Sequence, residues 1–376
     1  DEDPAVVVLD PQGQVAIPLL GGHSGGAEDL SQRLAAALGG QAVLTGSSGT
    51  QGRLALDAFG NHWGWTRGTG DWSGLMQSAA RARQLHLQQR AGLELWQELP
   101  AARALGLMPT PEPGPTDLVI STRQGAGCRW HPPQLWLGLG CERNTSLSVL
   151  ERIVRQSLAA ADLAEASVAG LTSIDRKGDE PALLQLAAQR GWPLRLWTAD
   201  QLDTVEVPNP SLAVAHEMGT ASVAEAAALL AAGPGGALTL CKRIEKAEPG
   251  EQGAATLAVA TAASQWAPQR GGLNLIGSGP GSLNLLTPEA REVLSRCRIW
   301  VGYGLYLDLL EPLRRPDQLR LDGQLTRERD RCAQALELAC QGVQVALISS
   351  GDSGIYGMAG LALELWLALD AQDRPT

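Results

Sequence analysis

Short apolar runs alternate with amphipathic segments along this chain. The pattern predicts strands at residues 5–9 and 41–44, with a helix at residues 27–38 between them. The same alternation begins again at residue 117 and a third time at residue 273. Strands that alternate with helices are typical of layered α/β folds. We therefore expect a multidomain α/β protein with mainly parallel sheets flanked by helices.

The alternation continues through the second and third of these stretches. Apolar runs predict strands, and apolar positions at three- and four-residue spacing predict helices. The predicted strands are 117–121, 134–139, 168–172, 273–276 and 343–349, the predicted helices are 146–163, 181–189 and 358–369, and segments 195–198, 223–232, 237–241 and 256–261 continue the alternation.

Proline marks a boundary in the first half of the chain. A helix-like region rich in Arg and Gln runs from 72 to 107, and residues 109–115 (PTPEPGP) follow it. Because proline at this density ends helices and makes an extended connector, we place a domain boundary there. The expected regions are 1–115, 116–263, a linker at 264–271, and 272–376.

Composition and charge narrow the classes of function. The 376 residues carry a net charge of −10, which argues against general binding to nucleic-acid phosphates. No apolar run is long enough to suggest a membrane span. The six cysteines form no C-x-x-C pair and no tight cluster with His, so we expect no metal site and take a reducing cytoplasm as the default. The chain begins without Met or a secretory signal, which suggests a cut or processed start.

A glycine-rich segment is the strongest local signal. Residues 277–281 (GSGPG) follow an apolar strand and lead to Thr287 and Pro288, which suit a helix start. Glycines let the backbone approach a ligand closely, so the segment predicts a cofactor loop. Ser282 stands where a dinucleotide fingerprint has its last glycine. A tight strand-to-helix connection is the alternative.

A second loop strengthens the prediction. Residues 349–359 (SSGDSGIYGMA) also follow an apolar strand and precede a helix. Because the carboxyl ends of parallel strands meet at one edge of a sheet, we expect the two loops to converge on a shared ligand site. For Asp352 the alternative is a turn or a helix cap.

These loops also carry a family resemblance. The segments GSGPGSLNLLTPEA (277–290), VGYGLYLDLL (301–310) and SSGDSGIYGMAG (349–360) together resemble the tetrapyrrole methylases, and among them precorrin-3B C17-methyltransferase, over about 105 residues. The resemblance implies that residues 272–376 form the N-terminal α/β half of a methylase domain. It also implies C17 methylation with ring contraction.

The resemblance further implies S-adenosylmethionine as the cofactor and a possible homodimer through the methylase domain. The cofactor-binding residues that it implies are Gly277, Gly279, Pro280, Gly281, Gly351, Asp352, Ile355 and Tyr356. The family's second domain should begin after the helix near residue 369, so we expect that this chain alone does not form the complete cofactor cleft.

The region before the linker resembles a second family. Residues 1–263 are similar to the cobalt-precorrin-5A hydrolases, which open a lactone on a contracted ring and release acetaldehyde. That family normally starts with a further strand-helix stretch, so we expect a truncated N-terminus. The matching segments are DPAVVVLDPQGQVAIPLLGGHSGGAEDL (3–30), LALDAFG (54–60), STRQGAGC (121–128), LGLGCERNTS (137–146), VAGLTSIDRKGDEPAL (168–183) and SVAEAAALLAAG (222–233).

Lactone opening needs a base to activate water and charge to stabilise the carbonyl oxygen. His23, within a glycine-rich segment, is a candidate base because imidazole titrates near neutrality. A helix cap or a turn is the alternative. Asp175 and Glu180 lie in a polar loop between a predicted strand and a predicted helix and are candidates for acid-base work. Acidic residues are also favoured at any helix N-terminus.

The carboxylates of the substrate need cationic partners. Arg143 precedes a predicted helix, so its guanidinium and the free helix amides could bind one carboxylate together. Arg129 is the second predicted substrate contact. A simple surface Arg is the alternative for Arg143, and Trp130 and Glu142 depart from the residues expected beside these two positions.

The leading hypothesis is therefore a bifunctional cobalamin-biosynthesis enzyme that acts on cobalt-precorrin tetrapyrroles. The first alternative is another tetrapyrrole methylase whose upstream region is a non-catalytic docking or regulatory module. The second is a protein that binds acidic ligands without turnover.

Overall fold

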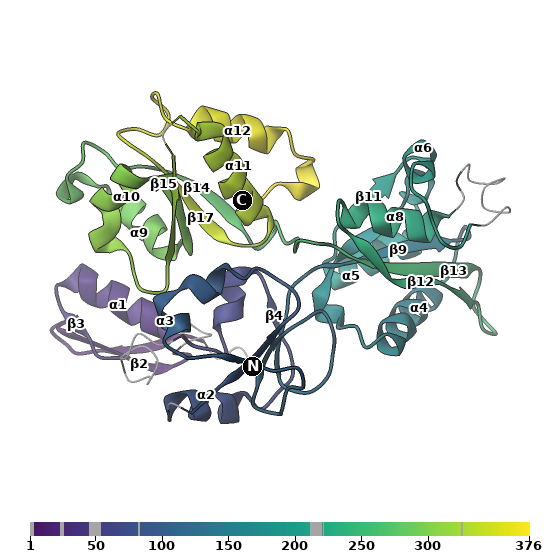
Figure 1. Cartoon of the computed structure of the whole chain (residues 1–376), viewed down its shortest axis with the longest axis horizontal. Coiled ribbons are helices and arrows are strands. Elements are labelled where there is room, and N and C mark those ends of the chain that lie inside the picture. The colour runs from purple at the N-terminus through teal and green to yellow at the C-terminus, as the bar shows by residue number, and fades with distance from the viewer. Residues whose placement is uncertain are drawn as a thin grey trace.

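The computed structural model describes residues 4–22, 26–44, 54–81, 83–210, 220, 222–324 and 326–376. The chain forms four sheets with helices packed on them (Figure 1). Short 3-10 helices lie at Phe59–Trp63, Leu95–Glu98, Glu165–Ser167, Asp175–Lys177, Leu283–Leu285, Glu311–Leu313 and Ala371–Asp373. Among the described residues, no helix is both long enough and apolar enough to cross a bilayer.

The N-terminal unit is a small sheet of strands β1 (Val6–Leu9), β2 (Val15–Leu20) and β3 (Gln41–Ala42). β1 pairs antiparallel with β2, and β2 pairs parallel with β3. Helix α1 (Ala27–Leu38) packs on β2 and has the bounds that the apolar pattern predicted. It ends at Gly39, whose φ of 71° is the left-handed conformation that glycine adopts without strain.

The middle sheet has the strand order β4-β8-β7-β5-β6. β5 to β8 are parallel, and β4 joins the edge antiparallel. Its elements are β4 (Thr66–Arg67), α2 (Trp72–Ala80), β5 (His86–Gln89), α3 (Pro100–Arg103), β6 (Met108–Pro109), β7 (Leu118–Ile120) and β8 (Cys128–His131). The sheet continues across residue 115, where the prolines led us to expect a boundary.

The sequence suggested that the region from 72 to 107 is helix-like throughout, but the structure shows otherwise. The region holds two short helices with β5 between them. β5 pairs with β6 on one side and β7 on the other, so contacts with residues distant along the chain determine its strand conformation.

The third sheet has the order β11-β10-β9-β13-β12. β9, β10 and β11 are parallel, and β13 and β12 extend the sheet antiparallel. α4 and α5 cover one face of this sheet, and α8 covers the other. The elements are β9 (Leu135–Cys141), α4 (Leu147–Ala160), β10 (Val168–Ile174), α5 (Pro181–Arg190), β11 (Leu194–Trp197), α6 (Ala199–Asp203), α8 (Val223–Ala232), β12 (Ala237–Lys246) and β13 (Ala254–Thr261).

The fourth sheet is parallel throughout, with the order β14-β17-β15-β16. α9 and α10 pack on one face, and α11 and α12 pack on the other. The elements are β14 (Gly272–Gly277), α9 (Pro288–Arg296), β15 (Ile299–Tyr303), α10 (Gly304–Leu310), β16 (Leu319–Gly323), α11 (Glu328–Cys340), β17 (Gln344–Ser349) and α12 (Ala359–Leu367).

The middle and fourth sheets share one apolar core. A continuous buried cluster includes Trp63, Trp96 and Trp130 of the middle region together with Val345 and Leu347 of β17. In Figure 1 the fourth sheet and its helices stand directly over the N-terminal and middle units. The contact is close at Gly64, where an added Cβ would lie 3.0 Å from the Cα of Gly342.

The segment expected to be a linker, 264–271, is packed into this junction. Gln265 is buried and accepts hydrogen bonds from Trp65 Nε1 (2.6 Å) and the Leu93 amide (3.2 Å). Its amide nitrogen donates to the carbonyl oxygens of Trp63 and Gln341. One side chain thus joins the middle region to the end of α11.

A second tie connects the third and fourth sheets. The Arg195 guanidinium stacks over the indoles of Trp136 (4.2 Å) and Trp266 (4.5 Å). It also forms an ion pair of 3.0 Å with Asp373, which follows α12. Stacking on two aromatic faces and pairing with a carboxylate are both favourable for a guanidinium.

Candidate functional site

The two glycine-containing loops of the fourth sheet meet directly. The amide of Gly279 donates to the carbonyl oxygen of Gly351 (3.0 Å), and the amide of Gly351 donates to the carbonyl oxygen of Gly279 (3.2 Å). β14 and β17 are parallel neighbours, so the loops that follow them leave the same edge of the sheet. The predicted convergence of the loops is confirmed.

Gly277 makes this contact possible. A Cβ added there would lie 2.4 Å from the carbonyl oxygen of Gly351, which is closer than real Cβ contacts come. Gly360 is the matched contrast, because a Cβ added at that position of α12 has nothing within 4 Å.

We therefore expect Gly277→Ala to separate the loops and lower the free energy of unfolding by about 1–3 kcal/mol, the usual cost of overpacking. Gly360→Ala should leave it unchanged or raise it by up to about 1 kcal/mol, because alanine favours helix. Urea unfolding of both variants checks this. Equal midpoints for the two variants would contradict the close packing at Gly277.

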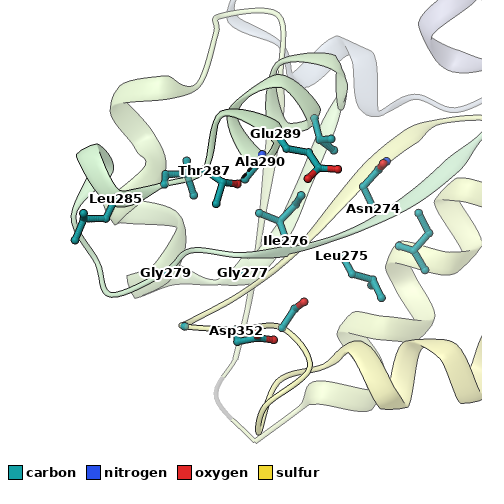
Figure 2. A pocket seen from close by; sticks show the side chains of 15 residues that line it. Asn274, Leu275, Ile276, Gly277, Gly279, Leu285, Thr287, Glu289, Ala290 and Asp352 are labelled. Atoms are coloured by element: carbon teal, nitrogen blue, oxygen red, sulfur yellow. Dashed lines mark hydrogen bonds between the residues drawn. The ribbon is translucent and has the colours of Figure 1, made fainter.

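A cavity of about 810 Å³ opens beside these loops. Thr287 caps α9 by accepting a 3.1 Å hydrogen bond from the Ala290 amide, which places Glu289 on the first turn of the helix at the cavity wall. Figure 2 shows Asp352 on one side of the β14 ribbon and Thr287 and Glu289 on the other. Asn274 of β14 also lines the cavity. The cavity thus combines two carboxylates, an amide and glycine backbone.

The structure separates the eight predicted cofactor residues into two groups. Gly277, Gly279, Gly351 and Asp352 line the cavity, whereas Pro280, Gly281, Ile355 and Tyr356 are not among its lining residues. Ile355 and Tyr356 are exposed, and Tyr356 has a positive φ of 53°. Asp352 accepts a 2.7 Å hydrogen bond from the Gly354 amide, so it also makes the turn that was its alternative. Sequence reasoning did not name Glu289 and Asn274 as site residues, because Glu289 lies on the first turn of α9 and Asn274 lies within β14.

A second cluster lies where β9 and β10 end. Arg143 follows β9, and its Nη1 lies 2.5 Å from an Asp179 carboxylate oxygen. Its Nη2 donates to the carbonyl oxygen of Arg176 (2.7 Å). This hydrogen-bonded pairing raises the pKa of Arg143 and lowers the pKa of Asp179. The predicted substrate cation is thus already joined to the loop after β10.

Glu180 is the unusual member of this cluster. Its side chain is 1% exposed, and neither carboxylate oxygen has a hydrogen-bond partner. Lys177 Nζ, on a side chain that is 3% exposed, lies 3.9 Å from Oε2, and Arg143 Nη1 lies 3.7 Å from the same atom. Glu180 stands at the N-cap position of α5, where acidic residues are favoured, but its side chain makes no cap hydrogen bond. A buried carboxylate without hydrogen bonds is costly and is uncommon in folded proteins.

The other predicted catalytic residues differ in placement. Asp175 is exposed and accepts a 2.7 Å hydrogen bond from the Arg176 amide. His23 lies outside the described residues. Among the described residues, no group of three or more His, Cys, Asp or Glu side chains could hold a metal ion.

The two predicted substrate cations are not brought together. Arg129 lies on β8, and the loop before it contacts residues 162–164, which precede β10. Arg143 and Glu180 contact each other beyond the opposite end of β10. β10 has seven residues, so the two places are separated by roughly 20 Å of strand.

Three protein families match the chain. The family described as Cobalamin synthesis G N-terminal matches residues 1–49, and Cobalamin synthesis G C-terminus matches residues 135–260. The family described as Tetrapyrrole (Corrin/Porphyrin) Methylases matches residues 272–373. Both resemblances drawn from the sequence are therefore confirmed.

Individual relatives agree with the families. The chain is 31% identical over 245 residues to a cobalt-precorrin-5A hydrolase of Salmonella typhimurium, covering 61% of this chain and 68% of that protein. It is 29% identical over 248 residues to the hydrolase of the same name from Priestia megaterium, covering 61% and 66%. Over 93 residues it is 52% identical to a probable cobalt-factor III C(17)-methyltransferase of S. typhimurium, covering 25% and 38%. The chain thus spans about two thirds of these hydrolases and little more than a third of this methyltransferase.

Proposed function

We propose that this chain, which belongs to the cobalt-precorrin-5A hydrolase family and continues into a tetrapyrrole methylase segment, catalyses two steps of cobalamin biosynthesis. The first is hydrolysis of the lactone of cobalt-precorrin-5A with release of acetaldehyde. The second is C17 methylation, with ring contraction, of a precorrin-3-type or cobalt-factor III substrate. A homodimer through the methylase domain stays a prediction.

The observation that carries the hydrolase proposal is the buried carboxylate of Glu180. Both cations approach Oε2, and the buried Oε1, which has no hydrogen-bond partner, would accept a proton from water that enters the site with the substrate. The water oxygen then attacks the lactone carbonyl carbon, and the acyl–oxygen bond breaks to release an alkoxide. Departure of acetaldehyde forms its C=O bond and breaks the carbon–carbon bond to the ring, and the ring carbon keeps that electron pair and takes up a proton. Lys177 and Arg143 are close enough to offset the negative charge that develops on the carbonyl oxygen. Asp175, at the same strand end, stays a candidate for acid-base work such as protonation of the ring carbon, and His23 stays the alternative base.

Release of acetaldehyde tests this proposal. The full-length protein, incubated with cobalt-precorrin-5A, should release one acetaldehyde for each substrate consumed, measured by reduction with alcohol dehydrogenase and NADH. A protein whose first region is only a docking or regulatory module would release none, and that result would overturn the proposal.

The cavity of the fourth sheet fits S-adenosylmethionine as the methyl donor. Its volume of about 810 Å³ lies within the ordinary range of small-molecule sites, about 300–1,000 Å³. The cofactor is a sulfonium that also carries an amino group, and both cationic centres suit a cavity that presents Asp352 and Glu289. The backbone at Gly277, Gly279 and Gly351 would hold the uncharged parts. When bound, the cofactor supplies a methyl group on a good leaving group, so the protein mainly orients the two reactants.

Asp352→Asn should therefore raise the KM for S-adenosylmethionine in the full-length protein about tenfold, because a charged hydrogen bond is worth about 1.5–3 kcal/mol. The kcat for methyl transfer should change less. Asp370→Asn, at an exposed position after α12, is the matched control and should leave both constants unchanged. If the Asp352 variant and the control have the same KM, Asp352 does not bind the cofactor.

A further inference from the structure

Two arginines at the carboxyl edge of the middle sheet are joined by the side chain of a third. Arg90 directly follows β5, Arg123 follows β7, and Arg129 lies on β8. β5 and β7 are adjacent and parallel, so Arg90 and Arg123 lie at the same edge. Arg129 lies opposite Val119 of β7, and its side chain reaches the loop after β7, where Nη1 bonds the Arg123 carbonyl oxygen. In open α/β sheets, ligands bind in the crevice outside this edge.

Arg129 is the anchor of the group. Arg129 is buried, with 6% of its surface exposed, and its Nη1 donates to the carbonyl oxygen of Arg123 (2.9 Å). Its Nε has no hydrogen-bond partner. Gly125, with a φ of 142°, lets the loop fold over the guanidinium, because a Cβ there would lie 2.7 Å from Nη2. The loop at Gly125 therefore packs against the positively charged guanidinium of Arg129.

No carboxylate neutralises this charge within the described residues. Arg90, Arg123 and Arg129 form no ion pair there with any Asp or Glu side chain. Burial lowers the pKa of Arg129, and the charge of Arg90 lowers it further. His131, whose Nδ1 lies 2.8 Å from the Ser121 carbonyl oxygen, has its pKa lowered by burial and by Arg129. An enclosed guanidinium that lacks a counter-ion is costly unless an anion joins it.

The loop is also held rigidly in place. The Gln124 amide donates to the Asp162 carbonyl oxygen (2.7 Å), and the Ala164 amide donates to the Thr122 carbonyl oxygen (2.8 Å). Arg123 Nη1 donates to the Ala161 carbonyl oxygen (2.8 Å). These bonds hold the loop at residues 122–124, after β7 of the middle sheet, against residues 161–164, before β10 of the third sheet. A ligand would therefore meet a preformed site.

We propose that Arg90, Arg123 and Arg129 form a carboxylate-binding site, separate from the Glu180 cluster, that takes the side-chain carboxylates of a tetrapyrrole. The assignment of a tetrapyrrole rests on the proposed function, whereas the preference for carboxylates follows from the enclosed guanidinium. Arg129 forms charge-assisted hydrogen bonds to one carboxylate, and the exposed Arg90 and Arg123 pair with its neighbours on the ring.

Binding of uroporphyrin, a porphyrin with eight carboxylates, by the full-length protein tests the site through fluorescence titration. Arg129→Gln should weaken binding at least tenfold, and Arg90→Gln should weaken it by a smaller factor. Arg155→Gln, at an exposed position of α4, is the matched control and should bind as the unchanged protein does. Glu180→Gln should also bind normally, because Glu180 lies beyond the opposite end of β10. Inorganic phosphate should compete only weakly if the site recognises the ring.

Each contrary result has a clear meaning. The proposal is overturned if the unchanged protein does not bind uroporphyrin, or if Arg129→Gln and Arg90→Gln bind as Arg155→Gln does. Equal weakening by Glu180→Gln would show a single site and overturn the separation. If phosphate displaces the porphyrin at equal concentration, the site binds anions in general, and the assignment of a tetrapyrrole is wrong. Acetaldehyde release is a different measurement, so failure of the hydrolase proposal would be seen independently.

Discussion

Replacement of Glu180 by glutamine should lower the rate of acetaldehyde release from cobalt-precorrin-5A by at least about 100-fold. A positioned general base contributes about 10²–10⁴-fold to a rate, and the amide has almost the same shape but cannot accept the proton. The KM should change little, because glutamine keeps the shape of the side chain and the cations Lys177 and Arg143 remain. Steady-state kinetics with the full-length protein measure both constants.

The control separates catalysis from folding. Glu165→Gln removes an exposed carboxylate that pairs with Arg190, and it should leave the rate unchanged. Glu180→Gln takes the counter-charge away from the buried Lys177 ammonium, so its thermal unfolding should occur at a lower temperature, and the rates are compared below that temperature. A Glu180→Gln enzyme that retains a rate within about threefold of the unchanged enzyme would exclude Glu180 as the base.

Replacement of Gln265 by methionine should lower the free energy of unfolding by at least about 3 kcal/mol. Methionine has a similar length but leaves the Trp65 indole, the Leu93 amide and two carbonyl oxygens without their partner. Each buried polar group that loses its partner costs about 1–3 kcal/mol. Urea unfolding followed by tryptophan fluorescence suits this measurement, because Trp63 and Trp65 lie at the site.

Gln185→Met, at an exposed position of α5, is the matched control and should change the free energy of unfolding by less than about 0.5 kcal/mol. If the Gln265 variant unfolds at the same urea concentration as this control, the junction does not depend on the glutamine. Separate transitions for the middle region and the fourth sheet in the Gln265 variant alone would show that the glutamine couples them.

The sequence was sufficient to predict elements that depend on local residue patterns or on the general geometry of parallel strands. The 27–38 helix has the predicted bounds because the apolar spacing is regular and Gly39 ends it. The same holds for the meeting of the loops at Gly279 and Gly351, which follows from the general geometry of parallel strands. β5 was missed, because HLQQ has no strong strand pattern and its pairing comes from β6 and β7.

The site was less predictable than the fold. That Asp352 faces the cavity while Ile355 and Tyr356 are exposed depends on the path of a single turn, including the positive φ of Tyr356. The burial of Glu180 depends on Lys177 and Arg143, which reach it from two different loops. Neither arrangement follows from residue types in order along the chain. The packing of 264–271 was hidden for the same reason, since all partners of Gln265 are distant in sequence.

The junction around Gln265 and Arg195 has a consequence for dividing the chain into two proteins. Two enzymes joined by a loose tether can be divided again by one stop codon between them. Here a stop codon before residue 264 would leave the Trp65 indole without its acceptor and Arg195 without both the Trp266 ring and Asp373. Either part alone would therefore need replacements at the groups that these contacts now satisfy.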